Sequence, residues 1–378
     1  METVDAVVRL ILIVAMLALL AGGLLAILIL WYVRGRDPHV GLVADILPEP
    51  PDDLSPGAAG TLLDEHADHH DVVATLLGLG RNGVVSITEE REEGARAREF
   101  TITLLHPDRV TSPVEHDLLR VLFGPDPQAL QEVRLRSVRA RFVAAEPRIR
   151  DALYDELVAR GYFPRSPAQT RRRWRRISWT GLVASLFTGL LVTILVDVFA
   201  LLPTIAALIV WAVMIRVSRN MPRKTPAGAE AAARWRAFRR YLESLVSRQD
   251  LHETAALFDR YLAYAVAFRI ERAWIAAFAD AGTRTPRWYH PAGMGEAGEL
   301  LDAAAAGLDM ARAAQLLGHL GTPGLDLPDV GAPGMPDVDL QAASDALGGS
   351  LQAVSDGFGD LLNAAGSIFD AIDFDLDA

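Results

Sequence analysis

The sequence contains no cysteine, and a single lysine, Lys224, stands among its 37 basic residues. The absence of cysteine excludes disulfide bonds, thiolate metal ligands, cysteine nucleophiles and lipid attachment through cysteine. With no cysteine present, cysteine usage does not indicate whether the protein folds in an oxidising or a reducing compartment. The near-absence of lysine fits a GC-rich coding bias, and we infer no function from it.

The net charge of −11 is unevenly distributed along the 378 residues. Residues 34–170 carry about −7, residues 171–290 about +11, and residues 291–378 about −14. The net charge of the whole chain therefore combines a basic middle region with acidic regions on either side of it. The basic residues of the middle region adjoin the longer of two apolar tracts.

The first apolar tract covers residues 10–33, which are 24 residues without a charge. A helix of about 20 apolar residues crosses the hydrocarbon core of a bilayer. The tract is longer than the apolar part of a cleaved signal peptide, and it passes directly into Trp31, Tyr32, Arg34 and Arg36. Interfacial aromatic residues followed by cations are typical of a retained anchor. We predict a first transmembrane helix over residues 8–33.

The second apolar tract covers residues 177–217, where Asp197 and Arg216 are the only charged residues. It is about twice as long as one span requires, so it must turn back, and Asp197 and Pro203 mark the turn. We predict a transmembrane hairpin with Asp197 at its tip. A functional carboxylate inside the bilayer is the alternative, which we disfavour because it costs about 2.5 to 3.5 kcal/mol at the midplane.

Basic residues flank both ends of the predicted hairpin, whereas Glu2 and Asp5 precede the first span and only Arg9 opposes them. The positive-inside rule therefore predicts three spans in the inner (plasma) membrane, with the N-terminus outside and the C-terminus cytoplasmic. Anionic lipid headgroups are the simplest expected partner of the flanking cations. These cations are Arg171, Arg172, Arg173, Arg175, Arg176, Arg219, Arg223 and Lys224.

The region between the first span and the hairpin begins with a linker, residues 34–54, whose prolines favour an extended spacer. Short helices are expected from Ser55-Pro56 and from Asp71 to Arg81, followed by strands at 84–88 and 100–104. This order is typical of a winged helix. We predict a cytoplasmic winged-helix-like α+β domain over residues 55–170.

The second half of this domain contains two further helix signals. Ser112-Pro113-Val114-Glu115 matches a capping box and predicts a helix over 113–123, with Gly124 after its end. A helix over 147–160 followed by an apolar strand at 161–163 would suggest a second, degenerate winged-helix unit.

Two regions follow the hairpin. Residues 218–290 are predicted to form a packed helical pair, for which an aromatic-lined ligand groove is the alternative. Residues 291–378 form an acidic Ala/Gly/Asp-rich tail, helical or disordered, with a heptad of apolar residues that we expect to bind a protein partner or a second copy. The heptad positions are Leu340, Leu347, Leu351, Val354, Phe358, Leu361 and Ile368.

A series of short motifs runs along the chain in a defined order: Trp31-Tyr32, Gly35-Arg36-Asp37-Pro38, Leu54-Ser55-Pro56, Ala74-Thr75-Leu76-Leu77, Thr225 to Gly228, Trp235, Tyr261-Leu262, Phe268 and Trp274. In this order they resemble the YciQ-like predicted bacterial membrane proteins, a domain family of unknown function. The resemblance covers about residues 31–289 and implies no catalytic residues. Members usually carry an extracytoplasmic β-rich domain before the first span, and we expect this chain to lack it.

Three local patterns could carry chemistry. Gly78 to Gly83 matches GxGxxG, but it ends a helix and precedes a strand, the reverse of a dinucleotide-binding turn. His66, His69 and His70 lie among carboxylates and could bind a metal, but a solvated loop between two helices is the explanation that we favour. Asp373, Asp375 and Asp377 alternate without the glycine and distal glutamate of a calcium loop. We therefore assign no catalytic, cofactor or metal residue.

The sequence as a whole favours a mainly α membrane protein with three transmembrane helices, a cytoplasmic winged-helix-like domain and a helical C-terminal region. We predict a non-enzymatic scaffold or signalling protein that presents cytoplasmic modules for partner binding or self-association. A membrane-anchored regulator that binds DNA is the alternative, through the basic strip Arg134, Arg136, Arg139 and Arg141, but a domain of charge about −7 should repel nucleic acid. A metal-dependent enzyme comes third.

Overall fold

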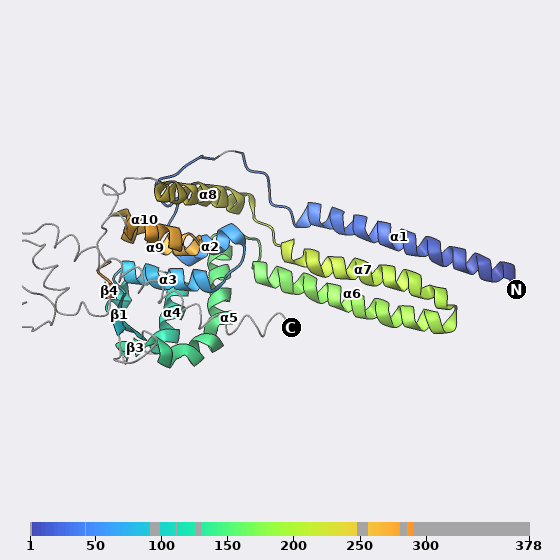
Figure 1. Ribbon diagram of the computed structural model, residues 1–378, viewed down its shortest axis with the longest axis horizontal. Helices are drawn as coiled ribbons and strands as arrows, with labels where there is room; N and C mark the ends of the chain where they lie inside the picture. The colour runs from blue at the N-terminus through green and yellow to red at the C-terminus, as the bar shows by residue number, and fades with distance from the viewer. Residues whose placement is uncertain are drawn as a thin grey trace, which may run out of the picture. The chain divides into compact units, whose positions relative to one another are not determined.

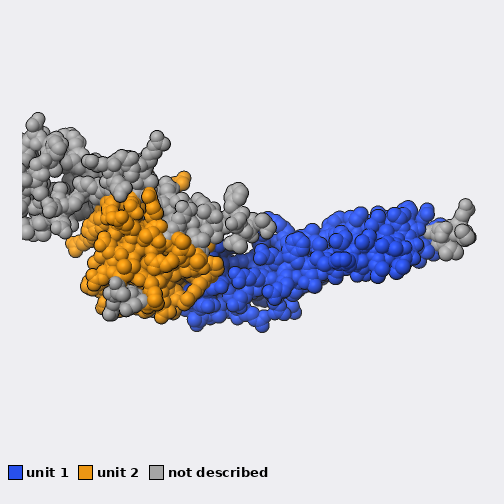
Figure 2. All heavy atoms as spheres, turned by 90° about the horizontal axis from the view of Figure 1, so that it is seen from below, with its two compact units in different colours: residues 1–54, 58–68, 150–241 blue, residues 55–57, 69–149, 242–378 orange. Residues whose placement is uncertain are grey.

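The structure is a computed structural model that describes residues 2–41, 43–90, 99–110, 112–125, 130–247, 256–279 and 286–290. The chain divides into two compact units (Figure 2). Unit 1 comprises residues 1–54, 58–68 and 150–241, and unit 2 comprises residues 55–57, 69–149 and 242–378. The predicted heptad, the acidic tail and the Asp373 to Asp377 pattern lie outside the described residues.

Three helices of unit 1 are long and apolar enough to cross a membrane, as the sequence predicts. They are α1 (Glu2–Arg34), α6 (Pro167–Leu195) and α7 (Leu201–Val217), the last extended by the short 3-10 turns η2 (Val198–Ala200) and η3 (Ser218–Asn220). Helix α7 packs against both α1 and α6 (Figure 1). Most of their large apolar side chains are exposed, as expected of a surface that faces lipid.

Small residues bring the spanning helices close together. Gly23 of α1 lies against Val210, and Gly181 and Gly189 of α6 lie against Trp211 and Thr204 of α7. The Trp211 indole donates a hydrogen bond to Ser185 Oγ at 2.9 Å. Close helix contact through glycine and an interhelical hydrogen bond are the usual means of association in lipid, where no hydrophobic force drives helices together.

The hairpin turns where the sequence predicts. Helix α6 ends at Leu195, and Asp197 accepts a hydrogen bond from the Phe199 backbone N–H at 2.8 Å, so its carboxylate caps the 3-10 turn η2. Arg9 of α1, the cation that opposed the predicted orientation, lies with its guanidinium carbon 4.7 Å from the centroid of the Phe199 ring. A cation–π contact therefore accounts for its position.

The described residues of the linker after α1 form neither helix nor strand, and the linker is not a free spacer. Arg240 of α8 (Pro226–Val246) donates hydrogen bonds to the carbonyls of Ala44 and Asp45 at 3.1 and 2.8 Å. The Leu47 N–H donates to the Ala237 carbonyl at 3.3 Å. The linker is thus tied to α8. Helices α2 (Pro56–Asp64) and α5 (Leu135–Ala159) complete the extramembrane elements that contribute to unit 1.

Unit 2 contains a four-stranded sheet in the order β3-β2-β1-β4. Strands β1 (Val85–Glu90) and β2 (Glu99–Leu104) pair antiparallel where two strands are predicted, with Val85 opposite Leu104. Strand β3 (Glu132–Arg134) pairs antiparallel with β2, and β4 (Tyr289–His290) pairs parallel with β1. The expected order of α2, α3, β1 and β2 is present, but the sheet has four strands instead of the two of a predicted wing.

The helices of unit 2 include α3 (His69–Arg81), α4 (Pro113–Phe123), α9 (Leu257–Ala267), α10 (Glu271–Ala279) and the 3-10 turn η1 (Pro107–Arg109). Helix α3 packs against α9. The capping box predicted for α4 is present, since Ser112 Oγ accepts from Val114 N and Glu115 accepts from Ser112 N. Gly124 follows the end of α4, as predicted.

Two predictions about helices are wrong. Helix α5 begins at Leu135 and continues through Pro147, because Val138, Phe142, Ile149, Leu153 and Leu157 form a buried apolar stripe at helical spacing that outweighs the proline. No strand follows at residues 161–163, which form a turn. The region after the hairpin contains three described helices, α8, α9 and α10, instead of a pair.

Strand β4 places two distant parts of the chain on the same side of the membrane. It lies after the hairpin in the sequence, yet it pairs with β1, which lies before the hairpin. The Tyr289 hydroxyl donates to Glu89 Oε2 at 2.9 Å, and the Trp288 indole donates to Asp259 of α9 at 2.7 Å. Since β1 and β4 share one sheet, α6 and α7 must together return the chain to the side from which it came.

This pairing predicts a specific cross-link. Thr88 and His290 are register partners, so the double variant T88C/H290C should form a disulfide under mild oxidation, visible as a mobility shift on a non-reducing gel. The variant T88C/R287C, in which the second cysteine is out of register, is the control. Equal cross-linking of both variants, or none of T88C/H290C, would contradict the pairing.

Candidate functional site

Lys224 lies at the centre of a junction that joins segments leaving α1, α2 and α7. Its side chain is 4% exposed. The Lys224 ammonium donates to Asp37 Oδ2 at 3.3 Å and to Glu65 Oε1, and the Lys224 backbone N–H donates to Asp37 Oδ1 at 2.8 Å. The ammonium also lies 5.6 Å from the centroid of the Phe163 ring. We call Asp37, Glu65 and Lys224 the ion cluster.

Glu65 is held on its backbone as well as its side chain. It has a φ of 67°, a left-handed conformation that is unusual for a residue other than glycine. Its carbonyl accepts a hydrogen bond from Arg171 Nη1 at 3.0 Å, and Arg171 Nη2 donates to the Tyr154 hydroxyl at 2.7 Å. The Ala67 N–H donates to the same hydroxyl at 2.8 Å. Arg171, at the start of α6, is therefore part of the junction.

A second group of contacts links the linker after α1 to the turn after α5. Asp52 Oδ2 accepts from the Tyr162 hydroxyl at 2.8 Å and from the Trp235 indole at 3.4 Å. Arg160 donates to the side chain and the carbonyl of Asp53. The linker is therefore fixed at this end too.

The segment after α7 is joined to the same turn through backbone contacts. The Thr225 N–H donates to the Tyr162 carbonyl at 3.0 Å, and Thr225 Oγ1 donates to the Gly161 carbonyl at 2.6 Å. Gly228 lies so close to the Tyr162 carbonyl that a Cβ would collide with it. The motif Thr225 to Gly228, which contributed to the family resemblance, thus has a packing role.

The junction shifts the pKa values of three groups. Burial, together with the hydrogen bond to Asp52, raises the pKa of Tyr162 to about 12. The hydrogen bond from Arg160 and its positive charge lower the pKa of Asp53. The pKa of Arg160 is raised, because the bond to Asp53 and the charges of Asp53 and Glu156 outweigh its burial. All three groups are held in the state that they have near neutral pH.

The junction connects separate segments of the chain through the buried side chain of Lys224. A lysine nucleophile must present a free amine to a substrate. The Lys224 amine is buried and donates hydrogen bonds to two carboxylates, Asp37 and Glu65. From the sequence, Lys224 was expected at the lipid headgroups and Asp37 contributed to a family motif, but no contact between Lys224, Asp37 and Glu65 was predicted. The only local signals were the uniqueness of Lys224 and its place after the last span.

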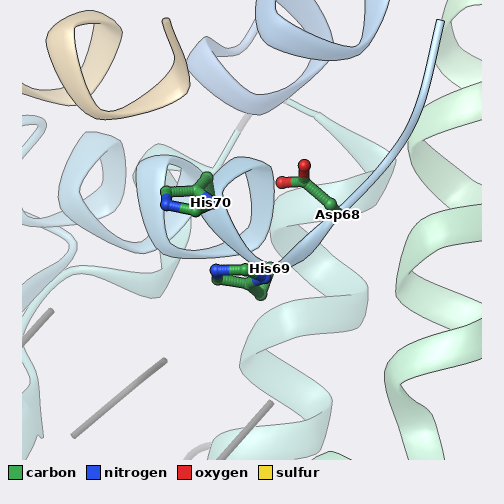
Figure 3. A group of neighbouring side chains, drawn as sticks. All are labelled: Asp68, His69 and His70. Atoms are coloured by element: carbon green, nitrogen blue, oxygen red, sulfur yellow. The ribbon is translucent and has the colours of Figure 1, made fainter. Parts of the chain in front are cut away.

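The histidine cluster is partly assembled at the start of α3. Asp68, His69 and His70 are half-buried and bring one possible metal-ligand atom each within 4.8 Å of one another (Figure 3). The rings of His69 and His70 lie 4.0 Å apart between centroids. His66 is not part of this group, and its Nδ1 is hydrogen-bonded to the Asp64 carbonyl at 2.8 Å. Metal binding remains a hypothesis for these three residues.

The GxGxxG pattern has a structural explanation. It ends helix α3 and precedes strand β1, the order that argues against a dinucleotide-binding turn. A Cβ on Gly80 would lie 2.7 Å from the Trp288 ring, and Gly83 has a φ of 70°. Close packing and a left-handed turn therefore account for these glycines.

The basic residues expected at the lipid surface fall into two groups. Lys224 is buried in the ion cluster and Arg171 is committed to the junction, so neither is available to lipid. Arg223 is exposed, but it also donates to the Val33 carbonyl at 3.2 Å. The side chains of Arg172, Arg173, Arg175, Arg176 and Arg219 are exposed.

The basic strip considered for DNA is exposed in part. Arg134, Arg136 and Arg141 are exposed, and Arg134 lies 3.9 Å from Glu90. Arg139 lies on α5, but its side chain is outside the described set.

Three apolar helices that can span a membrane, joined at one end by a network of buried ion pairs and hydrogen bonds, define a multi-pass membrane protein with a folded extramembrane part. Residues 45–278, more than half of the chain, match the family described as the predicted membrane protein (DUF2207) C-terminal domain. The protein belongs to this family, which confirms the resemblance drawn from its motifs. No curated protein and no solved structure matches the chain.

The ion cluster yields a prediction for stability. In K224M the carboxylates of Asp37 and Glu65 lose their cation. Removing one partner of a fully buried pair costs roughly 3–5 kcal/mol, and we expect about 2–3 kcal/mol here because both carboxylates are partly exposed. The measurement is thermal unfolding of the purified protein in detergent.

The control for this experiment is R234M, which breaks the exposed pair Arg234–Glu230 on α8 and should cost less than about 0.5 kcal/mol. If K224M unfolds at the same temperature as R234M, the ion cluster does not stabilise the junction.

The raised pKa of Tyr162 predicts a loss of stability at high pH. Because the folded state favours the neutral phenol, this contribution is complete below the ordinary pKa of 10.0 and is lost as the pH rises toward about 12. Y162F should lack this component, so the melting temperatures of the two proteins should converge between pH 10 and 12. Parallel curves over that range would count against the assignment.

Proposed function

We propose that the protein is a non-enzymatic scaffold or signalling protein of the bacterial inner membrane, whose cytoplasmic modules bind a protein partner or a second copy. The observation that supports this proposal most strongly is the junction around Lys224. If the spans served only as an anchor, a flexible linker between them and the extramembrane part would be sufficient. Here Asp37, three residues after α1, and Lys224, after α7, share one ion cluster.

The junction offers a route by which the spans can act on the extramembrane part. The linker after α1 is hydrogen-bonded to α8 through Leu47 and Arg240, and α8 follows directly after Lys224 and Thr225. A change in the tilt of α1 against α7 must therefore either move α8 or break the ion cluster. Such a mechanical link suits a protein that reports events in the membrane to a partner outside it.

The placement of the arginines supports a cytoplasmic location for the extramembrane modules. Arg172 and Arg176 precede the apolar part of α6, and Arg219 and Arg223 follow α7. At the other end of the hairpin lie Asp197 and one arginine, Arg9 of α1, which contacts the Phe199 ring. This asymmetry is the pattern of the positive-inside rule.

Cysteine labelling tests this orientation cleanly, because the chain has no native cysteine. S137C, at an exposed position of α5, should react with a membrane-impermeant thiol reagent only after cells are permeabilised. V198C, near the hairpin tip and 63% exposed, should react in intact cells. Labelling of S137C in intact cells would place the module outside and would exclude cytoplasmic partners.

Exposure of Arg134, Arg136 and Arg141 keeps DNA binding as a second candidate. A genuine phosphate interface of three arginines would give an affinity for duplex DNA that falls steeply with salt, with a slope of roughly −3 in a plot of log K against log salt. The full protein in detergent is titrated with duplex at several salt concentrations, and R134Q/R136Q/R141Q should abolish the slope. Lack of binding at low salt would eliminate this candidate.

A further inference from the structure

Helix α6 carries a line of arginines that ends in a tryptophan. On one uninterrupted helix, Arg175 and Arg176 lie three and four residues after Arg172, and Trp179 lies three residues after Arg176, so all four lie on one face. All four side chains are exposed, Trp179 by 53%. We call these four residues the α6 basic stripe.

The opposite face of α6 is occupied by α7. Gly181 and Ser185 meet Trp211, and Gly189 meets Thr204. Below the stripe the same exposed face continues into apolar side chains, Val183, Leu186 and Phe187, of which Phe187 is 69% exposed. Since α7 takes one face, the face with the stripe is the one that a span presents to lipid.

The depth of the stripe matches the headgroup layer. Exposed tryptophan and tyrosine on spanning helices mark the interface, and Tyr32 of α1, 60% exposed, has Arg36 over its ring at 5.2 Å. At a rise of 1.5 Å per residue, Arg175 and Arg176 lie about 5 Å beyond Trp179, and Arg172 about 10 Å beyond it. The polar layer of each leaflet is about 5–8 Å thick. The flexible arginine side chains can therefore reach the phosphates.

The three guanidinium groups of the α6 basic stripe have no partner among the described side chains. Among the described residues, the side chains of Arg172, Arg175 and Arg176 take part in no ion pair or hydrogen bond, in contrast to the side chain of their neighbour Arg171. Three guanidinium groups on one face, next to an interfacial indole, complement a lipid phosphate, which arginine binds through paired N–H groups. We propose that the α6 basic stripe binds the headgroup of an anionic phospholipid in the leaflet where α6 enters the membrane.

The test uses the full-length protein in lipid nanodiscs. Phosphatidylcholine discs receive a minor fraction of brominated phosphatidylglycerol or of brominated phosphatidylcholine, and bromine quenches nearby tryptophan. The Trp179 signal is the difference between the wild type and W179F. We expect phosphatidylglycerol to quench it preferentially, and R172Q/R175Q/R176Q to reduce that preference by on the order of 100-fold, since each surface arginine contributes about five-fold.

The matched control is R134Q/R136Q/R141Q, which removes three exposed arginines from β3 and α5 and should keep the preference. Circular dichroism and gel filtration establish that both variants fold. Three results would overturn the proposal: no preference in the wild type, an equal loss in both variants, or loss of the preference in phosphate buffer of equal ionic strength, which would indicate a site for free anions. None of these results depends on the orientation of the protein in the membrane or on a protein partner. This experiment therefore tests lipid binding independently of the proposed function.

Discussion

The structure depends on one buried cation. Moving Lys224 out of water costs several kcal/mol, and this cost is recovered only while both Asp37 and Glu65 face it. The three residues come from segments after α1, after α2 and after α7, so their pairing sets the relative positions of these segments. With that register in place, Tyr162 can reach Asp52, and Thr225 can reach the turn after α5. The remaining contacts of the junction follow from the ion cluster.

Features that depend on neighbouring residues could be predicted from the sequence. The three spans follow from the length of the apolar runs, the hairpin turn from Asp197, and the start of α4 from the capping box at Ser112. Strands β1 and β2 are marked by their β-branched residues. In each case the decisive residues lie within one continuous stretch of chain.

The junction could not be predicted in this way, because its partners lie far apart. Lys224 is 187 residues from Asp37 and 159 from Glu65, and Arg160 is 107 residues from Asp53. No periodic pattern in the sequence relates positions so far apart. Other residues of suitable charge lie near each of them, so charge alone does not identify the pairs. Helix α5 was misplaced for a related reason, since a buried stripe overrides a local proline signal. Strand β4, only two residues long, has too little pattern to be found.

The pairing of β1 with β4 also has a consequence for biogenesis. The ribosome delivers β1 first, then both hairpin helices, and β4 about 200 residues later. Until the hairpin is inserted and the chain has returned, the β1 edge that β4 will cover stays open, and open strand edges invite aggregation. The sheet cannot be completed in a molecule that inserts only one of the two hairpin helices, because β1 and β4 would then lie on opposite sides of the membrane. Completion of a domain outside the bilayer thus acts as a check on assembly within it.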